Sequence, residues 1–299
     1  MRIIKPSFEI WDQEEGLEGM QTHIERCGRV CYASEPKGNP VEFVQRMINS
    51  GHGAMLEHGT IYLVVTPEDG IKDSRLWECA NNKYSKINYE SETGLNYITT
   101  NLRVLVENNW MDLLKYSTNP TKYHEKRVTV HFTTQIAITR EYNRHRVNSM
   151  AEQSTRYCNY GKDKFGGVGI NLPNWVDSEI QRLEDITENV LPTFEQLKEE
   201  YFSVSDQGLT KDDWGDIEWW LWSNLVAEES YLKLIEKGRK PQEARVVLPL
   251  DTNTELIHTA FVSDWNHFFE LRDDSHAHPD ARLLAHPLHE IFKERNLIV

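Results

Sequence analysis

Segments with the residue period of a strand alternate along this chain with segments that have the period of a helix, and no linker separates them. Residues 127–133 alternate valine and phenylalanine with polar residues, which predicts a strand with one buried face. Asn39 can cap a helix that Pro40 begins, and apolar residues follow at helical spacing until Gly51. The sequence has no internal repeat and no low-complexity run, so it predicts a single α/β domain, mixed α+β, with insertions.

The same patterns predict the other elements of this domain and two additions to it. Residues 66–126 are polar and rich in turns, which indicates an insertion, and about 177–215 is predicted as a helical elaboration. The segments predicted as strands are 2–11, 60–65, 127–133 and 254–262. The other segments predicted as helices are 17–32, 180–201, 216–237, 264–271 and 279–295.

The composition is that of a globular protein with a substantial core. Charged residues make up 27% of the 299 residues and hydrophobic residues 39%, with 9 Trp and 12 Tyr, whereas a disordered chain would carry few aromatics. No stretch approaches the roughly 18 consecutive apolar residues of a membrane span, and the first residues do not resemble a signal peptide. We therefore expect no membrane association and a cytoplasmic location.

The net charge limits the partners that this chain can bind. A formal charge of −14 disfavours sequence-independent binding to nucleic acids, because their phosphates would be repelled. An anionic ligand must therefore be held by a local cationic pocket. Clustered arginines are for this reason informative in this chain.

The densest such cluster reads Arg-Glu-Tyr-Asn-Arg-His-Arg and contains Arg140 and Arg144. If this stretch is helical, the two arginines share one face, where like charges are unfavourable unless an anion lies between them. Glu152, Ser154 and Arg156 follow at a spacing of two, so an extended segment would point all three to one side. Hydroxyl, guanidinium and backbone amide groups together can bind a phosphate. The alternative is a solvated loop with internal ion pairs.

The order of these residues resembles a known signature. Arg-His-Arg at 144–146, followed after seven residues by Ser154, resembles the signature of flavin-dependent thymidylate synthases. Glu152, Arg156 and Tyr157 extend the match.

Three distant segments resemble other elements of that family, in the family's order. They are Gly-His-Gly-Ala-Met-Leu-Glu-His at 51–58, Ala-Arg-Val-Val-Leu-Pro at 244–249, and Trp-Asn-His-Phe-Phe-Glu-Leu-Arg at 265–272. Each segment alone is weakly specific, but their joint occurrence is specific and covers most of the chain. The resemblance implies reductive methylation of dUMP to dTMP, with FAD as cofactor, methylenetetrahydrofolate as carbon donor and NADPH as reductant. It also implies a homo-oligomer, typically a homotetramer, with FAD between subunits.

The resemblance assigns roles to individual residues. Arg272 would be catalytic, because a guanidinium beside the uracil stabilises the anion that forms when the ring loses its N3 proton. The implied FAD residues are His52, Ala54, Glu57, Arg144, His145, Arg146, Glu152, Phe261, Ser263 and His267. The implied dUMP residues are Glu141, Tyr142, Asn143, Arg144, Glu152, Gln153, Ser154, Thr155, Arg156, Arg245 and Arg272.

Some of these positions depart from the family's pattern. Phe261 and Ser263 stand where members commonly have an asparagine and an arginine that contact FAD. Ala54 replaces a hydroxyl residue, Glu141 replaces a glutamine near the pyrimidine, and Ala151 replaces an asparagine. One alternative is therefore a nucleotide-binding relative that has lost FAD-dependent catalysis.

A metal-dependent nucleotide hydrolase is a further alternative, because the chain has 12 histidines. No histidine pair has the zinc-protease spacing, so we predict no metal and expect His276 and His278 to cap or flank a helix. No Gly-x-Gly-x-x-Gly motif follows a strand, so FAD and NADPH are not expected to bind through a dinucleotide fold. The cysteines form no Cys-x-x-Cys pair and are expected to be reduced: Cys27, Cys31, Cys79 and Cys158.

Alternatives also exist for individual side chains. Ser154 could be a nucleophile, but a ligand contact is preferred because no His-Asp pairing is evident. The tryptophans at 219, 220 and 222 are expected on a buried helix face or in a subunit contact rather than on a ligand. Cys158 is expected to be packed rather than reactive. Arg272 could pair with Asp273, Asp274 or another acid instead of facing a ligand.

Overall fold

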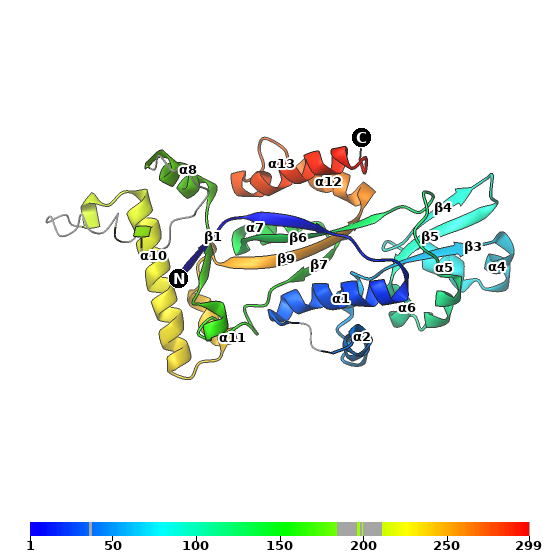
Figure 1. The fold of residues 1–299 in the computed structure, drawn as a ribbon, viewed down its shortest axis with the longest axis horizontal. Coiled ribbons are helices and arrows are strands. Elements are labelled where there is room, and N and C mark those ends of the chain that lie inside the picture. Colours follow the sequence, from blue (N-terminus) through cyan, green and yellow to red (C-terminus); the bar gives the residue numbers. More distant parts are fainter. Residues whose placement is uncertain (36–37, 184–195, 198, 200–210, 299) are drawn as a thin grey trace.

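A computed structural model describes residues 1–35, 38–183, 196–197, 199 and 211–298, and it shows a mixed α/β fold (Figure 1). The central sheet has four antiparallel strands in the order β2-β6-β9-β7. The strands expected at 127–133 and 254–262 are confirmed as β6 and β9, the two inner strands. The four strands are β2 (Ser7–Trp11), β6 (Arg127–Gln135), β9 (Asn253–Phe261) and β7 (Ser149–Glu152).

The single strand expected over 2–11 is wrong. The segment forms β1 (Arg2–Ile4) and β2, which belong to different sheets. Pro6 separates them; it has no N–H to donate to a ladder, so a strand is readily interrupted there. β1 pairs in parallel with β8 (Gly169–Asn171) in a sheet of its own.

Helices cover both faces of the central sheet (Figure 1). One face carries α1, and α2 packs against α1. Asn39 caps α2 as expected, its Oδ1 accepting a hydrogen bond from Val41 N at 2.9 Å. The opposite face carries α12 and α13, whose aromatic side chains pack with Phe132 of the sheet. The bounds are α1 (Gly16–Tyr32), α2 (Pro40–Asn49), α3 (Gly53–Leu56), α7 (Ile136–Tyr142), α12 (Val262–Arg272) and α13 (Pro279–Glu294).

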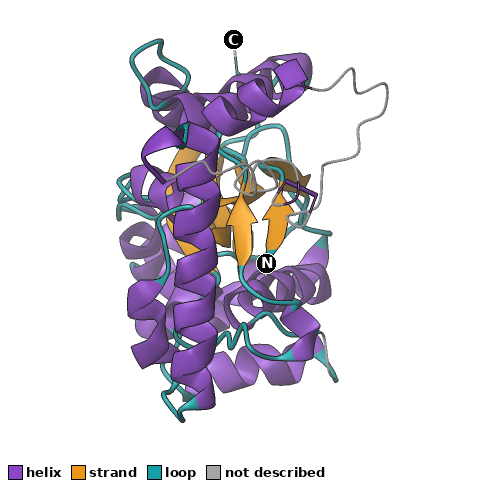
Figure 2. Ribbon diagram, turned by 90° about the vertical axis from the view of Figure 1, so that its left-hand side faces the viewer, coloured by secondary structure: helices purple, strands orange, loops and turns teal. Residues whose placement is uncertain are grey.

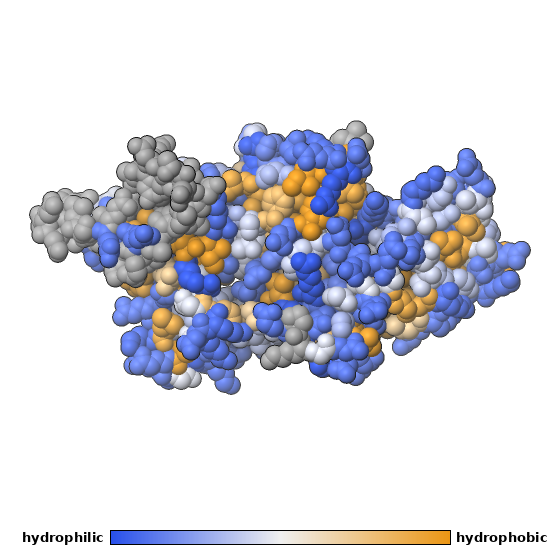
Figure 3. All heavy atoms as spheres, viewed as in Figure 1, coloured by the Kyte–Doolittle hydropathy of each residue, from blue (hydrophilic) through white to orange (hydrophobic). Residues whose placement is uncertain are grey.

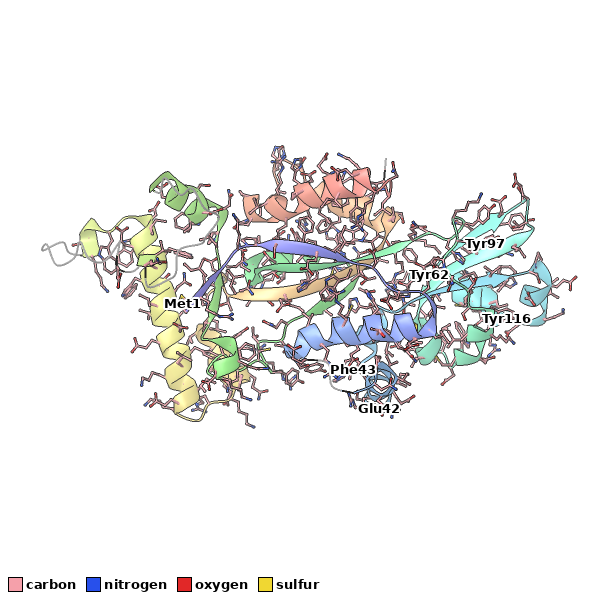
Figure 4. All side chains as sticks on the ribbon, viewed as in Figure 1. Met1, Glu42, Phe43, Tyr62, Tyr97 and Tyr116 are labelled. Carbon is pink, nitrogen blue, oxygen red and sulfur yellow. The ribbon has the colours of Figure 1, made fainter. Side chains whose placement is uncertain are left out.

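The segment expected as a polar insertion, 66–126, contributes to a second sheet. The strand expected at 60–65 is confirmed as β3, and it pairs with β5, which pairs with β4. Tyr62 and Tyr97 of this sheet, labelled in Figure 4, both pack against His124, with ring centroids 5.1 and 5.2 Å away. The elements are β3 (Thr60–Val65), α4 (Pro67–Lys72), α5 (Arg75–Ala80), β4 (Lys86–Glu90), β5 (Leu95–Asn101), α6 (Leu102–Glu107) and a 3-10 helix at Met111–Tyr116.

The other end of the molecule is helical, and Figure 2 looks onto α10 with the strands behind it. The helix expected at 216–237 is confirmed as α10 (Asp216–Glu236). The helix expected at 180–201 falls largely outside the described residues, and the described helix there is α8 (Asn174–Leu183). The remaining short elements are α11 (Pro241–Ala244) and 3-10 turns at Asp163–Phe165, Lys211–Asp213 and Arg245–Val247.

The tryptophans of α10 divide between its two faces. Trp220 is buried and its Nε1 donates to Asp251 Oδ2 at 2.8 Å, which confirms a buried helix face at that position. Trp219 is 44% exposed and forms a cluster with Trp214 and Trp222. No helix in the described ranges is long and apolar enough to cross a membrane. The face drawn in Figure 3 is mainly hydrophilic, in keeping with the net charge of −14.

Candidate functional site

A cavity of about 640 Å³ lies where β7 ends, beside the start of α7 and the segment that follows α11. Residues from three separate parts of the sequence meet there, and Arg245 Nη1 donates to Thr155 Oγ1 at 3.1 Å across 90 positions. Five of the residues predicted to bind dUMP line this cavity: Glu152, Gln153, Ser154, Thr155 and Arg245. The structure thus brings together two of the four segments that carry the resemblance.

Glu152 is the acid of this cavity. Its carboxylate accepts from Thr139 Oγ1 at 2.8 Å and from Asn143 Nδ2 at 3.2 Å. Burial raises the pKa of Glu152 above its usual value, and these hydrogen bonds oppose the rise. Asn143, another predicted dUMP residue, therefore lies next to the cavity through its bond to Glu152.

The extended course expected through Arg156 is wrong. β7 ends at Glu152, and the chain turns after Ser154, whose Oγ accepts from Arg156 N at 3.2 Å. Serine favours such turns because its side chain can bond the backbone two residues on. The Arg156 side chain is exposed, lies 5.4 Å from the Tyr157 ring, and donates to Gln242 Oε1 at 3.3 Å.

The second group of predicted residues surrounds Arg272, the last residue of α12. Arg272 Nη1 donates to Glu141 Oε2 at 2.9 Å, and Nη2 donates to the Glu141 carbonyl at 2.7 Å. Arg272 therefore pairs with an acid, as the alternative allowed, but the acid is Glu141 rather than Asp273 or Asp274. The Asp273 carboxylate instead accepts hydrogen bonds from His286 and His289 of α13.

Arg144 and His145 lie beside this pair. α7 ends at Tyr142, so Arg144 is beyond the helix and does not share a helical face with Arg140 as expected. Arg144 Nη1 reaches the same Glu141 oxygen at 3.3 Å, and its side chain is 70% exposed.

His145 is buried against Phe268 and His267, with ring centroids 5.2 and 5.7 Å away. Burial lowers the pKa of His145 to about 4, and the neighbouring charge of Arg272 adds to the effect. The ring is therefore neutral at pH 7, so its Nε2 can accept from Arg272 Nε at 3.3 Å.

The residues around α3 form a third group. His52 Nδ1 lies 3.1 Å from Tyr32 Oη, and the Tyr32 ring lies 5.6 Å from that of Tyr157 in the signature. Ala54 is exposed, and Glu57 forms an ion pair with Arg103 of the inserted segment. His52 is thus connected to the signature through the contact between the tilted rings of Tyr32 and Tyr157.

Phe261 and Ser263 contact the inserted segment and its flank. Phe261 is buried, with the Arg127 guanidinium 5.5 Å and the Lys86 ammonium 5.6 Å from its ring. Ser263 Oγ donates to Glu125 Oε1 at 2.5 Å. The Phe261 side chain is therefore occupied by protein contacts rather than presented to a ligand.

Tyr142 is also not brought to the cavity. Its side chain is fully buried, and its hydroxyl donates to the Ala281 carbonyl at 2.8 Å. The aromatic core between the sheet and α12 and α13 takes up the ring. A side-chain contact between Tyr142 and dUMP is thus not supported by the structure.

Two arginines outside the predicted set lie beside the predicted site residues. Arg140 is exposed and lines the cavity with Arg245; its membership of the arginine cluster was the signal. Arg127 is half-buried, and its guanidinium donates to the Glu57 carbonyl at 2.9 Å and to Ser149 Oγ at 2.9 Å. Burial lowers the pKa of Arg127 to about 10. Through these two hydrogen bonds, Arg127 connects Glu57, next to α3, with Ser149 of β7. Nothing in the sequence indicated this connection.

The histidines near the C-terminus form hydrogen bonds with nearby residues of α13 and of the segment before it. His278 caps α13, its Nδ1 accepting from Asp280 N at 3.2 Å, which confirms the expected capping. His276 bonds Asp274, and His286 and His289 bond Asp273. Within the described residues, no group of three or more His, Cys, Asp or Glu is placed to hold a metal ion. Cys158 is buried in a hydrophobic cluster, as expected.

A second cavity, of about 530 Å³, contains none of the predicted site residues. It lies between the start of α1, β3 and the start of β6, with Trp11, Tyr62 and Arg295 among the residues that line it. The Trp11 ring already has two protein neighbours, because the Arg26 guanidinium carbon lies 3.7 Å and the tilted His131 ring 4.5 Å from its centroid. Trp11 is therefore not placed to stack on a ligand.

Comparison with known proteins gives one family match and several relatives. The family model described as thymidylate synthase complementing protein matches residues 110–296. A flavin-dependent thymidylate synthase of Thermosipho melanesiensis is 30% identical over 172 residues, which are 56% of this chain and 63% of the relative. One of Thermosipho africanus is 28% identical over 167 residues, again 56% and 63%. The chain thus spans less than two thirds of the length of these relatives.

Among solved structures, the UMP/dUMP methylase PolB of Streptomyces cacaoi, bound with 5-Br UMP, is 15% identical. The superposition covers 98% of this chain and 91% of that one, with a TM-score of 0.42.

Proposed function

Because the chain belongs to the thymidylate synthase complementing protein family, we propose that it is a flavin-dependent thymidylate synthase. It converts dUMP to dTMP, with FAD as cofactor, methylenetetrahydrofolate as carbon donor and NADPH as reductant. The observation that carries this proposal is the cavity in which Arg245 meets Glu152, Ser154 and Thr155. These residues lie in two of the segments that resemble flavin-dependent thymidylate synthases.

The cavity has the chemistry that a nucleotide monophosphate requires. Arg140 and Arg245 give it two exposed guanidinium groups, in a protein whose overall charge would otherwise repel a dianion. Ser154 and Thr155 add hydroxyls, and Glu152 adds a carboxylate that can accept from a sugar hydroxyl or a ring N–H. We assign the phosphate to the arginines, because bidentate guanidinium contacts suit phosphate oxygens.

The residues proposed for FAD offer a donor set that fits a flavin nucleotide. Arg144 and Arg146 are exposed at the end of α7, and His52 and His267 present exposed rings. When bound, the flavin supplies the redox chemistry that completes the methyl group, so no cysteine nucleophile is needed. Burial accordingly raises the pKa of the Cys31 thiol to about 12 and that of Cys158 to about 11, so neither is a reactive thiolate.

Arg272 is the proposed catalytic residue. It cannot lose its proton, so it is a permanent positive charge that can stabilise a uracil ionised at N3. Trp265, Phe268 and Phe269 hold α12 in the core, so the end of the helix is fixed. The neutral His145 orients the guanidinium through Nε.

We further propose that the protein acts as a homotetramer in the cytoplasm, with FAD between subunits. The proposed FAD residues form two groups in one chain, one around α3 with His52 exposed and one where the end of α7 meets α12 with Arg144 and His267 exposed. A cofactor held by more than one chain would use such separate groups.

The test is an assay of the purified protein with dUMP, NADPH, FAD and methylenetetrahydrofolate. We expect a yellow protein that forms dTMP and depends on all four. A colourless protein that binds dUMP but neither binds nor reduces added FAD would instead indicate a nucleotide-binding relative without flavin chemistry.

A further inference from the structure

Glu141 lies between two arginines, Arg144 and Arg272, that the proposed function assigns to ligand binding. Its Oε2 accepts from Arg272 at 2.9 Å and from Arg144 at 3.3 Å, and its carbonyl accepts a second bond from Arg272 at 2.7 Å. The pair is partly withdrawn from water, since the side chains of Arg272 and Glu141 are 11% and 28% exposed.

In this arrangement each guanidinium nitrogen of Arg272 already donates a hydrogen bond to the protein. Two of its nitrogens bond Glu141 and the third bonds the neutral His145. Charge-assisted hydrogen bonds of this kind are among the stronger ones, and a partly buried pair is screened less than an exposed one. A ligand that needs Arg272 must therefore compete with a bond that already exists.

The contacts of Glu141 also set the local charge. Two guanidinium groups and one carboxylate leave a single net positive charge at this point. A nucleotide monophosphate is a dianion, so the carboxylate opposes its approach as well as holding the arginine. Both effects act in the same direction, toward weaker binding.

We infer that Glu141 is a positioning residue that acts as an internal competitor: its carboxylate holds Arg272 and Arg144 in the free protein, and the nucleotide must displace it. This inference rests on the proposed function, because it takes the ligand to be a pyrimidine nucleotide. It adds that nucleotide binding includes an opening step, in which Arg272 exchanges the Glu141 carboxylate for the ligand. The carbonyl of Glu141 can keep its bond during that exchange and so limit the movement of Arg272.

The test measures dUMP affinity by calorimetry on the purified oligomer, for the wild type and three variants. Glu141→Gln keeps the shape and one neutral acceptor but removes the charge. Glu141→Asp keeps the charge on a shorter side chain. Glu236→Gln is the matched control, because Glu236 is an exposed acid of α10 that pairs with Lys233 at 2.7 Å.

We expect Glu141→Gln to bind dUMP roughly tenfold more tightly than the wild type, since one opposing charge is gone. Glu141→Asp should bind no more tightly than the wild type, and Glu236→Gln should match it. In stopped-flow mixing, the observed binding rate of the wild type should reach a plateau with dUMP concentration, set by the opening step. The plateau should be absent or higher in Glu141→Gln.

Failure of the competitor role and failure of the proposed function give different results. If the wild type binds dUMP and Glu141→Gln binds it equally or less tightly, the competitor role is overturned and the proposed function stands. If the wild type does not bind dUMP at all, the proposed function fails first, and this inference fails with it. An unchanged thermal unfolding midpoint in Glu141→Gln will show that a change in affinity does not reflect misfolding.

Discussion

The two arginine groups of this molecule differ in what they contact. Arg140 and Arg245 are exposed and line an open cavity. The Arg272 side chain is only 11% exposed, and it donates hydrogen bonds to Glu141 and His145. Arg245 donates a hydrogen bond to the neutral Thr155 hydroxyl, whereas Arg272 must exchange an ion pair with Glu141 before it can bind a ligand. If the proposed function holds, we expect capture of the phosphate and engagement of the base to be separable events.

The largest effect is expected from removing Arg272. Arg272→Ala should retain flavin and its reduction by NADPH but lower dTMP formation by roughly 10²–10³-fold, because a preorganised donor to the developing anion is lost. Arg272→Lys should restore only part of the rate, since it keeps the charge without the planar fork. Flavin absorbance and dTMP formation are measured on the same samples.

Arg282→Ala is the matched control for this prediction, because Arg282 bonds the carbonyl of Asp273 next to Arg272. It should form dTMP at close to the wild-type rate. Near-normal dTMP formation by Arg272→Ala would contradict the difference drawn between the two arginine groups.

The stability of the protein should depend on pH, because the buried histidines His23 and His145 are hard to protonate in the folded state. Burial lowers the pKa of His23 and of His145 to about 4. Between pH 6.5 and about 4 the unfolded chain binds protons at these rings that the folded chain does not, so acid favours unfolding. The free energy of unfolding should therefore fall as pH drops through this range, by up to about 3 kcal/mol for His23.

Chemical unfolding at pH 7 and pH 4.5 measures this effect. His23→Gln, which keeps a polar group opposite Thr129, should show a smaller loss of stability between the two pH values than the wild type. His276→Gln, at a position 93% exposed, should show the same loss as the wild type. Equal pH dependence in all three proteins would mean that His23 is not held neutral by the fold.

The open arginine group is tested by Arg245→Ala. The variant should bind dUMP roughly 10- to 100-fold more weakly, as expected for a lost charge-assisted hydrogen bond, while its flavin content is unchanged. Calorimetry with dUMP and the flavin spectrum provide the two measurements. Arg239→Ala, which removes an exposed arginine nearby, should bind dUMP normally; if the two variants behave alike, Arg245 does not contact the nucleotide.

The smallest effect is expected at Ser154. Ser154→Ala should keep measurable turnover and weaken dUMP binding by roughly 0.5–1.5 kcal/mol, the loss of one neutral hydrogen bond. Ser178→Ala, on α8 and outside the lining of the cavity, serves as control. Abolished turnover with unchanged dUMP affinity would instead point to a nucleophilic serine.

The sequence predicted the elements with a regular period and missed the features that depend on tertiary contacts. Strands β6 and β9 and helices α1, α2 and α10 were predicted because their apolar residues recur at the spacing of the element. Pro6 interrupts the strand pattern between β1 and β2, because proline cannot donate to a ladder hydrogen bond.

At the site, the sequence indicated which residues gather around the cavity but not what each one contacts. Arg245 and Thr155 could be placed together only by the resemblance, since 90 positions separate them. The pairing of Arg272 with Glu141 is a contact between helices α7 and α12, and no local pattern encodes it. Tyr142 was misassigned because a fully buried tyrosine and a ligand-binding one look alike in sequence.

The β3-β5-β4 sheet shares its hydrophobic core with α1 and α2. Met20 and Ile24 of α1 and Phe43 of α2 belong to the same cluster as Leu76 and Ile98 of the inserted segment. Removing residues 66–126 would expose the apolar faces of both helices to water, at about 25 cal/mol for each Å² uncovered. The inserted segment is therefore not a detachable module: a shortened version of this chain would have to be redesigned along α1 and α2, and a chimera that exchanges the insertion would have to exchange their packing residues as well.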